Sequence, residues 1–129
     1  MSSVLSGLAA AMHLLYAAMF GGPIDGTSWD VKVRQQGFFH WTTQTDTLVF
    51  HRGKAVIAGA IAKGYAPAVY EAREDGSGTE FSVHLEQDGR DAVDWSGRVN
   101  HDRIAGVKTV RGSNGRVARY VFSGGRKAG

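Results

Sequence analysis

Between Asp88 and Arg119, apolar and polar residues alternate along the chain, and short turn sequences interrupt this alternation. The interruptions are Asp88-Gly89, Asn100-His101-Asp102 and Asn114-Gly115, and such sequences are typical of tight turns between paired strands. Alternation with a period of two directs one set of side chains to each face of a strand. The stretch therefore predicts an antiparallel β meander, in which each strand pairs with the next one along the chain.

The same pattern recurs in the preceding part of the chain. It is clear in residues 28–34, where Trp29, Val31 and Val33 share one face, and again in residues 80–87. Residues 54–62 are rich in alanine, but the turn before them and Gly59 favour a strand there as well. Together these segments predict an all-β fold, an antiparallel up-and-down meander that closes into a small barrel of about eight strands. Closure is favoured because it removes exposed strand edges.

The chain divides into three parts. Its 129 residues suit one domain, which we place at residues 23–124 as an antiparallel β-barrel. Residues 1–22 precede it as an apolar helical segment, and residues 125–129 follow it as a flexible basic tail. Three glycines stand inside expected strands, where strong bends or bulges are predicted: Gly59, Gly97 and Gly106.

The segment from Ser2 to Gly22 contains no Lys, Arg, Asp or Glu, and Gly21-Gly22-Pro23 ends it. A helix that is apolar all round is buried in protein or in lipid. Three interpretations remain open: an export signal, a retained membrane anchor or docking helix, and a core helix. The candidate membrane or docking residues of this segment are Leu8, Leu14, Leu15, Tyr16 and Phe20.

Cysteine is absent, so disulfides, cysteine-type zinc sites and iron–sulfur clusters are excluded. The net charge is +3, and the basic residues concentrate in the last third of the chain. Such asymmetry can mark an anionic partner, but we favour the interpretation that these charges lie on outward strand positions. The basic residues concerned are Arg98, Arg103, Lys108, Arg111, Arg116, Arg119, Arg126 and Lys127.

Several short segments combine turn residues and core positions in a familiar order along the chain. They are residues 24–33; residues 46–50 with Gly53-Lys54; Gly64-Tyr65 with Tyr70; residues 95–99 with Asp102, Ile104 and Gly106; and residues 120–124. In this pattern of turns and core positions the sequence resembles small, uncharacterised bacterial exported domains with a lipocalin-like (calycin) β-barrel. The resemblance covers nearly all of residues 24–124. It implies a lipocalin-like barrel and an exported protein, and it implies no particular activity.

Motifs of catalysis or cofactor binding are not found. The sequence has no glycine-rich phosphate loop before a helix, no G-x-S-x-G elbow and no H-E-x-x-H. The histidines His40, His51, His84 and His101 are scattered, so we expect no metal site. Asp88, Asp91 and Asp94 are interpreted as a solvated hairpin end. We therefore expect a non-catalytic protein without a cofactor.

Aromatic residues offer a better indication of function. A barrel of about eight strands is either filled by side chains or holds one small ligand, and we favour filling while leaving a small apolar pocket open. The candidate interior or pocket-lining residues are Trp29, Phe50, Tyr65, Tyr70, Phe81, Trp95, Tyr120 and Phe122. Phe38, Phe39 and Trp41 form a candidate interaction patch, which would mark a protein or membrane contact.

Three functions follow from these observations. The favoured hypothesis is a binding or accessory domain, periplasmic or otherwise extracytoplasmic and either free or membrane-anchored, whose partner is a protein or a membrane. The second is a soluble, lipocalin-like carrier of a small apolar ligand. The least favoured is a binder of nucleic acid or an anionic surface, with the basic residues Arg98, Arg111, Arg116 and Arg119.

Overall fold

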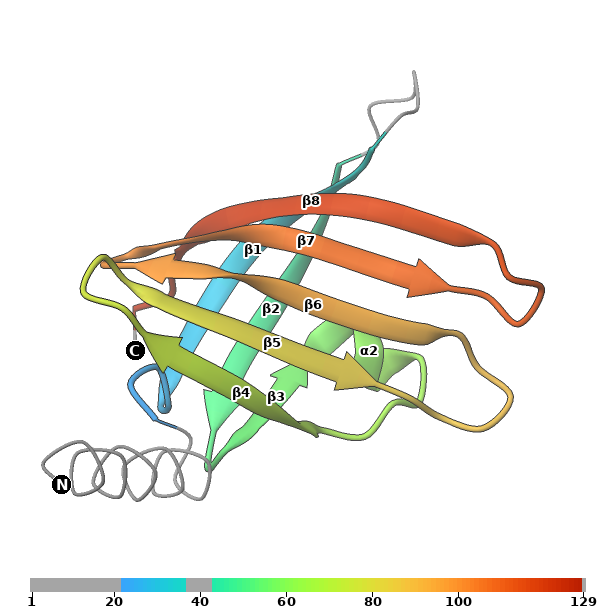
Figure 1. The fold of residues 1–129 in the computed structure, drawn as a ribbon, viewed down its shortest axis with the longest axis horizontal. Coiled ribbons are helices and arrows are strands. Elements are labelled where there is room, and N and C mark those ends of the chain that lie inside the picture. The colour runs from blue at the N-terminus through green and yellow to red at the C-terminus, as the bar shows by residue number, and fades with distance from the viewer. Residues whose placement is uncertain (1–21, 37–42, 129) are drawn as a thin grey trace, which may run out of the picture.

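The computed structural model describes residues 22–36 and 43–128, which form a closed antiparallel barrel of eight strands in up-and-down order (Figure 1). The elements are β1 (Thr27–Gln35), β2 (Thr43–His51), β3 (Lys54–Ile57), α2 (Ala58–Ala62), β4 (Ala68–Glu74), β5 (Thr79–Leu85), β6 (Ala92–Asn100), β7 (Arg103–Arg111) and β8 (Val117–Arg126). The predicted all-β fold, the meander and the closure are thereby confirmed. The predictions for residues 1–21 and for Phe38, Phe39 and Trp41 lie outside the described residues.

Alternation along each strand produces the core. In β5 every second residue is buried, from Thr79 to Leu85, and β1 shows the same pattern. The inward side chains of all eight strands meet in one cluster with Phe50 and Leu48 fully buried. Burial of such side chains stabilises the fold by roughly 1.5–3 kcal/mol each.

The barrel closes between its first and last strands. Trp29 pairs with Arg126 and Gln35 pairs with Tyr120, so β8 continues through Arg126. Residues 125 and 126, which we had placed in a flexible tail, therefore belong to β8, and the backbone N–H of Lys127 still donates to the carbonyl oxygen of Ser28 at 2.8 Å. A Cβ atom on Gly124 would lie 1.9 Å from the carbonyl oxygen of Asp30, so only glycine permits this close approach of β8 to β1.

The prediction of a strand through residues 58–62 was wrong, because β3 ends at Ile57 and α2 follows. Alanine has the highest intrinsic helix propensity, and three alanines lie in these five residues. The Oδ1 atom of Asp46 also accepts a hydrogen bond of 2.8 Å from the backbone N–H of Gly59, in the first turn of α2. Gly59 therefore lies in a short helix and does not bend a strand.

Gly97 and Gly106 are directly opposite each other in β6 and β7. The pairing of these strands is continuous from Ala92–Arg111 to Asn100–Arg103, so the glycines do not form a bulge. A Cβ atom on Gly106 would lie 2.1 Å from the carbonyl oxygen of Ser96. Both glycines permit the tight approach of the two strands.

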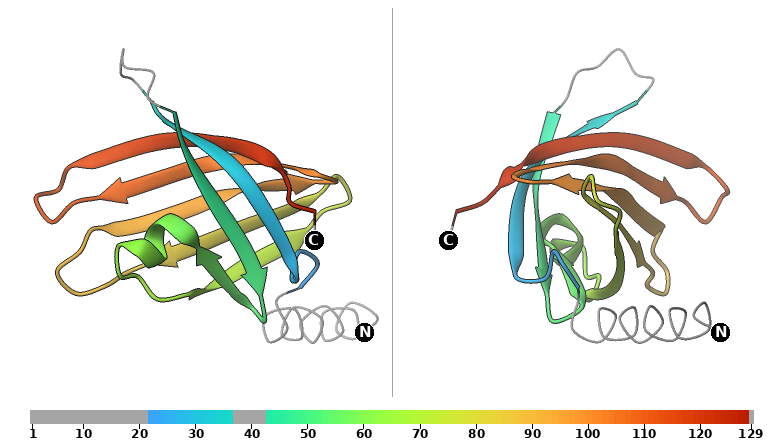
Figure 2. Two further views of the ribbon diagram at one scale, coloured as in Figure 1. Left: turned by 180° about the vertical axis from the view of Figure 1, so that it is seen from behind. Right: turned by 60° about the vertical axis from the view of Figure 1, so that its left-hand side comes forward.

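The two ends of the barrel differ. At one end, which we call the sealed end, the turn of residues 23–26 lies beside the β2–β3 turn, and the C-terminus is near (Figures 1 and 2). The other end carries α2 and the β5–β6 and β7–β8 loops, and we call it the cavity end. Gln36 and Thr43, which flank the undescribed residues 37–42, belong to the cavity end as well.

Hydrogen bonds of Thr27, which are buried, and of Asp25, which are exposed or partly buried, close the sealed end. The Nε1 atom of Trp29 donates to Oγ1 of Thr27 at 2.8 Å, and this hydroxyl donates to the carbonyl oxygen of Ile24 at 2.6 Å. Asp25 accepts hydrogen bonds of 3.0 Å from two backbone N–H groups of the β2–β3 turn and from the Tyr70 hydroxyl. Burial, then this contact with Asp25, raises the pKa of Tyr70 well above its usual range.

Candidate functional site

A cavity of about 350 Å³ lies at the cavity end, inside the rim formed by α2 and the β5–β6 loop. Apolar side chains and charged side chains both contribute to its wall. The residues that line it include Gln44, Thr45, Asp46, Ile57, Ala60, Lys63, Tyr65, Arg90, Asp91, Val93, Trp95, Lys108 and Val110.

Lys108 is the most unusual residue of this wall. It stands in β7 between Gly106 and Val110, on the inward face of the strand, and is half-buried. Its Nζ atom lies 5.2 Å from the ring centroid of Trp95 and 5.3 Å from that of Tyr120. Both distances are within the range of a cation–π interaction. Lys108 is thus a charged residue held against two rings inside the barrel.

The surroundings of Lys108 disfavour its charged form. Burial, and then the nearby positive charge of Lys63, lower the pKa of Lys108, while the negative charge of Asp46 acts in the opposite direction. Lys108 forms no ion pair with any of the residues that the structure describes. The structure therefore corrects the expectation that Lys108 is an outward surface charge.

Trp95 contributes a second unusual group. Its side chain is almost fully buried, with 1% exposed. Its Nε1 atom has no hydrogen-bond acceptor within residues 22–36 and 43–128. Leaving a buried donor unpaired costs about 1–3 kcal/mol. Trp95 thus combines a ring in the cavity wall with a donor that lacks a partner.

The rim of the cavity is tied together by Tyr65 and Asp46. The hydroxyl of Tyr65 donates to the carbonyl oxygen of Asp91, which joins the α2–β4 connection to the β5–β6 loop. Asp46 accepts from the backbone N–H groups of Thr47 and Gly59, both at 2.8 Å, and so attaches α2 to β2. These contacts hold three segments of the rim in fixed positions.

The predicted interior aromatics divide into two groups. Most fill the centre of the barrel: the ring of Phe50 lies 4.8 Å from that of Tyr70 and 5.2 Å from that of Phe81. Phe122 and Trp29 are buried in the same core. Tyr65 and Trp95 instead line the cavity, and Tyr120 lies half-buried beside Lys108. The centre is therefore filled, and free space remains at one end.

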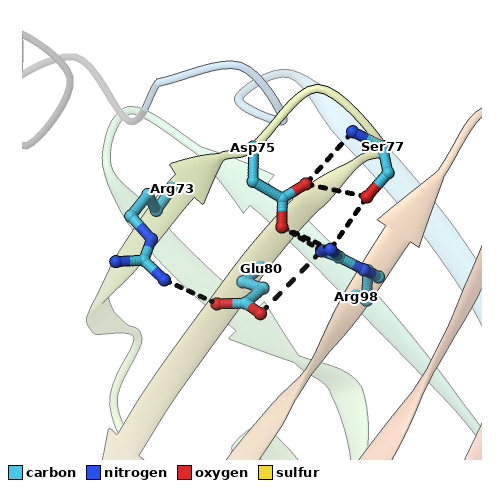
Figure 3. Close-up of polar contacts among 5 residues, drawn as sticks. All are labelled: Arg73, Asp75, Ser77, Glu80 and Arg98. Carbon is cyan, nitrogen blue, oxygen red and sulfur yellow. Dashed lines mark hydrogen bonds and ion pairs between the residues drawn. The ribbon is translucent and has the colours of Figure 1, made fainter.

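The basic residues proposed for an anionic partner are not equally available. Arg98 donates to Asp75 with both terminal nitrogens, at 2.8 Å from Nη1, and to Oγ of Ser77 at 3.0 Å (Figure 3). Glu80 lies 3.9 Å from Arg98 and 3.3 Å from Arg73. The hydrogen bonds from Ser77, with a further contribution from Arg98, lower the pKa of Asp75. Arg98 is thus enclosed by acidic groups, whereas Arg111, Arg116 and Arg119 are exposed.

The scattered histidines and acids do not gather into one site. Nδ1 of His84 lies 2.6 Å from Asp94, and its Nε2 lies 3.3 Å from Glu86, on the outer surface. Asp88 is exposed in the β5–β6 loop, and Asp91 lines the cavity. Among the described residues, no three His, Cys, Asp or Glu side chains are grouped as metal ligands would be. Residue His40 lies outside the described residues.

A wider and shallower groove of about 970 Å³ crosses the outer faces of β4 to β7. Exposed Val69 and Val107 lie in its wall. Its charged residues include Arg73, Glu80 and Arg98, which are paired with acidic or basic neighbours. Because these three charged residues already have partners and no buried polar atom of the groove is unpaired among the described residues, this groove is a weaker candidate than the cavity.

Sequence reasoning missed Lys108 and Asp46 as residues of the interior. The alternation along β7 already indicated this position, because Lys108 lies an even number of residues from Ile104 and Gly106 and therefore on the same face of the strand. In β2, Asp46 is on the same face of the strand as Leu48 and Phe50, since the three are alternate residues. The prediction had grouped Lys108 by charge with the arginines, and grouping it by position would have found it.

Comparison with models of known protein families gives no match, and comparison with curated proteins gives none either. The closed eight-stranded barrel is compatible with a lipocalin-like fold. Within the described residues, no helix has the length and apolar character needed to cross a membrane.

Proposed function

We propose that the protein is a non-catalytic binding protein that holds one small molecule in the cavity at the cavity end. The observation that carries this proposal is the cavity of about 350 Å³ beside Trp95 and Lys108, in a barrel whose centre is otherwise filled. Ligand sites are typically concave, mostly apolar, and equipped with a few polar groups that fix orientation. The wall of this cavity is concave and combines apolar side chains such as Ile57, Tyr65 and Val93 with a larger share of polar and charged groups than such sites usually have.

A matched pair of variants tests this function. Ala60 lines the cavity, whereas Ala62, in the same short helix, is exposed and does not. In a ligand-observed NMR screen of small aromatic compounds, Ala60→Phe should abolish the binding found with the wild type, because the added ring occupies the cavity. Ala62→Phe should bind as the wild type does. Equal binding by both variants, or no binding by the wild type, would contradict the proposal.

A second role concerns the segment before the barrel. The absence of Lys, Arg, Asp and Glu from Ser2 to Gly22 favours an exported or membrane-tethered accessory domain, and the resemblance to exported lipocalin-like domains supports the same location. The mass of the mature protein from its native host tests this role, because it shows whether the segment is retained. Fractionation of the intact chain with the soluble cytoplasm, without any partner, would contradict it.

A further inference from the structure

We infer that the cavity binds a small organic anion, whose carboxylate or similar acidic group pairs with Lys108 and whose ring or short apolar body packs against Trp95 and Tyr65. This inference rests on the proposed function and specifies the chemistry of the ligand. Three observations carry it: the charges in the cavity, the donor of Trp95 and the size of the space.

The first observation is a positive charge without a counter-ion. Lys108 faces the interior and has no ion-pair partner among the described residues, and the charge of Lys63 reaches it from the rim. Asp46 is the acid that acts on Lys108, but its Oδ1 already accepts two backbone N–H groups. A half-buried ammonium in these surroundings is stabilised by an anion that enters the same space.

The second observation is the unpaired N–H of Trp95. An indole nitrogen can only donate, so its missing partner has to be an acceptor. The ammonium of Lys108 lies over the indole ring of Trp95, and both residues line the cavity. An acid that pairs with Lys108 would therefore lie beside this indole, where one of its oxygens is a candidate for the acceptor that Trp95 lacks.

The third observation concerns the volume of the cavity and the numbers of basic and acidic side chains in its wall. About 350 Å³ is near the lower end of ligand pockets, which span roughly 300–1,000 Å³, and this suits a molecule with one ring or a short chain. Three basic side chains line the space, Lys63, Arg90 and Lys108, against two acidic ones, Asp46 and Asp91. A cationic ligand would meet the repulsion of Lys108 and Lys63, so the balance favours an anion.

Three probes with the same ring test the inference: phenylacetate, 2-phenylacetamide and phenethylamine, which are negative, neutral and positive. Isothermal titration calorimetry on the full chain should give an affinity for phenylacetate about 10-fold to 100-fold above that for the amide, because a hydrogen bond to a charged group is worth that difference. Phenethylamine should bind more weakly than the amide. The indole N–H resonance of Trp95 should shift on addition of phenylacetate.

Substitutions of lysines test whether Lys108 is the residue responsible for the preference for the acid. Lys108→Met should remove the preference for the acid and keep the binding of the amide, and Lys108→Arg should keep the preference. Lys54→Met is the matched control, since Lys54 is an exposed lysine of β3 near the sealed end, and it should behave as the wild type. If Lys108→Met does not fold, the wild-type ranking and its weakening by salt decide the question.

The outcomes separate the two proposals. Equal affinity for acid and amide, or tighter binding of the amine, overturns the anion inference and leaves the binding function intact. Absence of binding for all three probes contradicts the proposed function itself. An acid preference that survives in Lys108→Met overturns the role of Lys108.

Discussion

The two ends of the barrel differ in whether their buried polar groups have hydrogen-bond or ion-pair partners. At the sealed end, the indole N–H of Trp29 donates to Thr27, and Thr27 donates to the carbonyl oxygen of Ile24. At the cavity end, the indole N–H of Trp95 has no acceptor within the described part of the chain. Lys108 there also lacks an ion-pair partner among the same residues.

This difference distinguishes an end whose buried polar groups are satisfied from the end that we propose as the binding site. Buried polar groups are satisfied in the great majority of cases, so an exception needs a physical reason. Sequences depart from good packing and full hydrogen bonding mainly where a site is formed. The sealed end is therefore the part whose buried polar groups hold the barrel together, and the cavity end is the part that we propose as the binding site.

The strongest test of the comparison replaces one aspartate at each end. Asp25→Ala should lower the free energy of unfolding by about 3 kcal/mol, because Asp25 accepts three hydrogen bonds that join two turns and β4. Asp46→Ala should cost about 1 kcal/mol, since its contacts lie at the rim. Urea unfolding followed by far-ultraviolet circular dichroism measures both. Equal losses of unfolding free energy in the two variants would contradict the conclusion that the sealed end contributes more to stability.

The seam between β8 and β1 offers a second test on neighbouring glycines. Gly124→Ala should destabilise the protein by about 2 kcal/mol, because the added methyl group overlaps the backbone of Asp30. Gly125→Ala should change stability by less than about 0.5 kcal/mol, because its nearest atoms are 3.7 Å away. The shift of the thermal midpoint of each variant reports the difference. A tolerated Gly124→Ala would show that the seam is looser than this contact requires.

The two tryptophans give a direct comparison of the ends. Trp29→Phe removes a ring and a hydrogen bond to Thr27, whereas Trp95→Phe removes a ring and an unpaired N–H. The first substitution should therefore cost about 1 kcal/mol more than the second. Chemical denaturation of both variants under one condition measures this difference. A larger loss for Trp95→Phe would mean that its indole nitrogen has a stabilising partner.

Lys108→Met should raise the free energy of unfolding near neutral pH by up to about 1 kcal/mol, because the folded state keeps the ammonium half-buried. Burial lowers the pKa of Lys108 below 10.5, so the cost is complete below the folded-state pKa and declines as the pH rises toward 10.5. The stability difference between wild type and variant should shrink over that interval. A constant difference, or a clear loss of stability in the variant, would contradict this account.

The sequence predicted the fold, and it predicted the aromatic residues Tyr65 and Trp95 of the candidate site but not its charged residues, for a physical reason. Alternation of residues such as Trp29, Val31 and Val33 is a local signal, and it determines which face of a strand is buried. The site depends on register, since Lys108 meets Trp95 and Tyr120 only because β7 pairs with β6 and β8 at those residues. Helix α2 was missed because Gly59 was interpreted as a strand position despite the alanines around it, and the hydrogen bond of Gly59 to Asp46, thirteen residues earlier, is not visible in the local pattern.

The smallest expected effect lies on the outer wall, away from both ends. The hydrogen bond to Asp94, and then the contact with Glu86, raise the pKa of His84 above 6.5 against the opposing effect of burial. A raised pKa means that the stabilising contribution is complete below 6.5 and is lost as the pH rises through the folded-state value. The side chain of His84 is 54% exposed, so solvent screening holds this contribution below about 1 kcal/mol.

An NMR titration of the His84 ring measures the pKa directly. Asp94→Asn should return it toward 6.5, and Glu86→Gln should have a smaller effect because that contact is longer, 3.3 Å against 2.6 Å. The stability gap between wild type and Asp94→Asn should be wider at about pH 6 than at about pH 8. A wild-type pKa at or below 6.5, or equal effects of the two variants, would contradict the assignment. Because this contact is exposed and already paired, a ligand bound in the cavity as proposed should leave the titration of His84 unchanged.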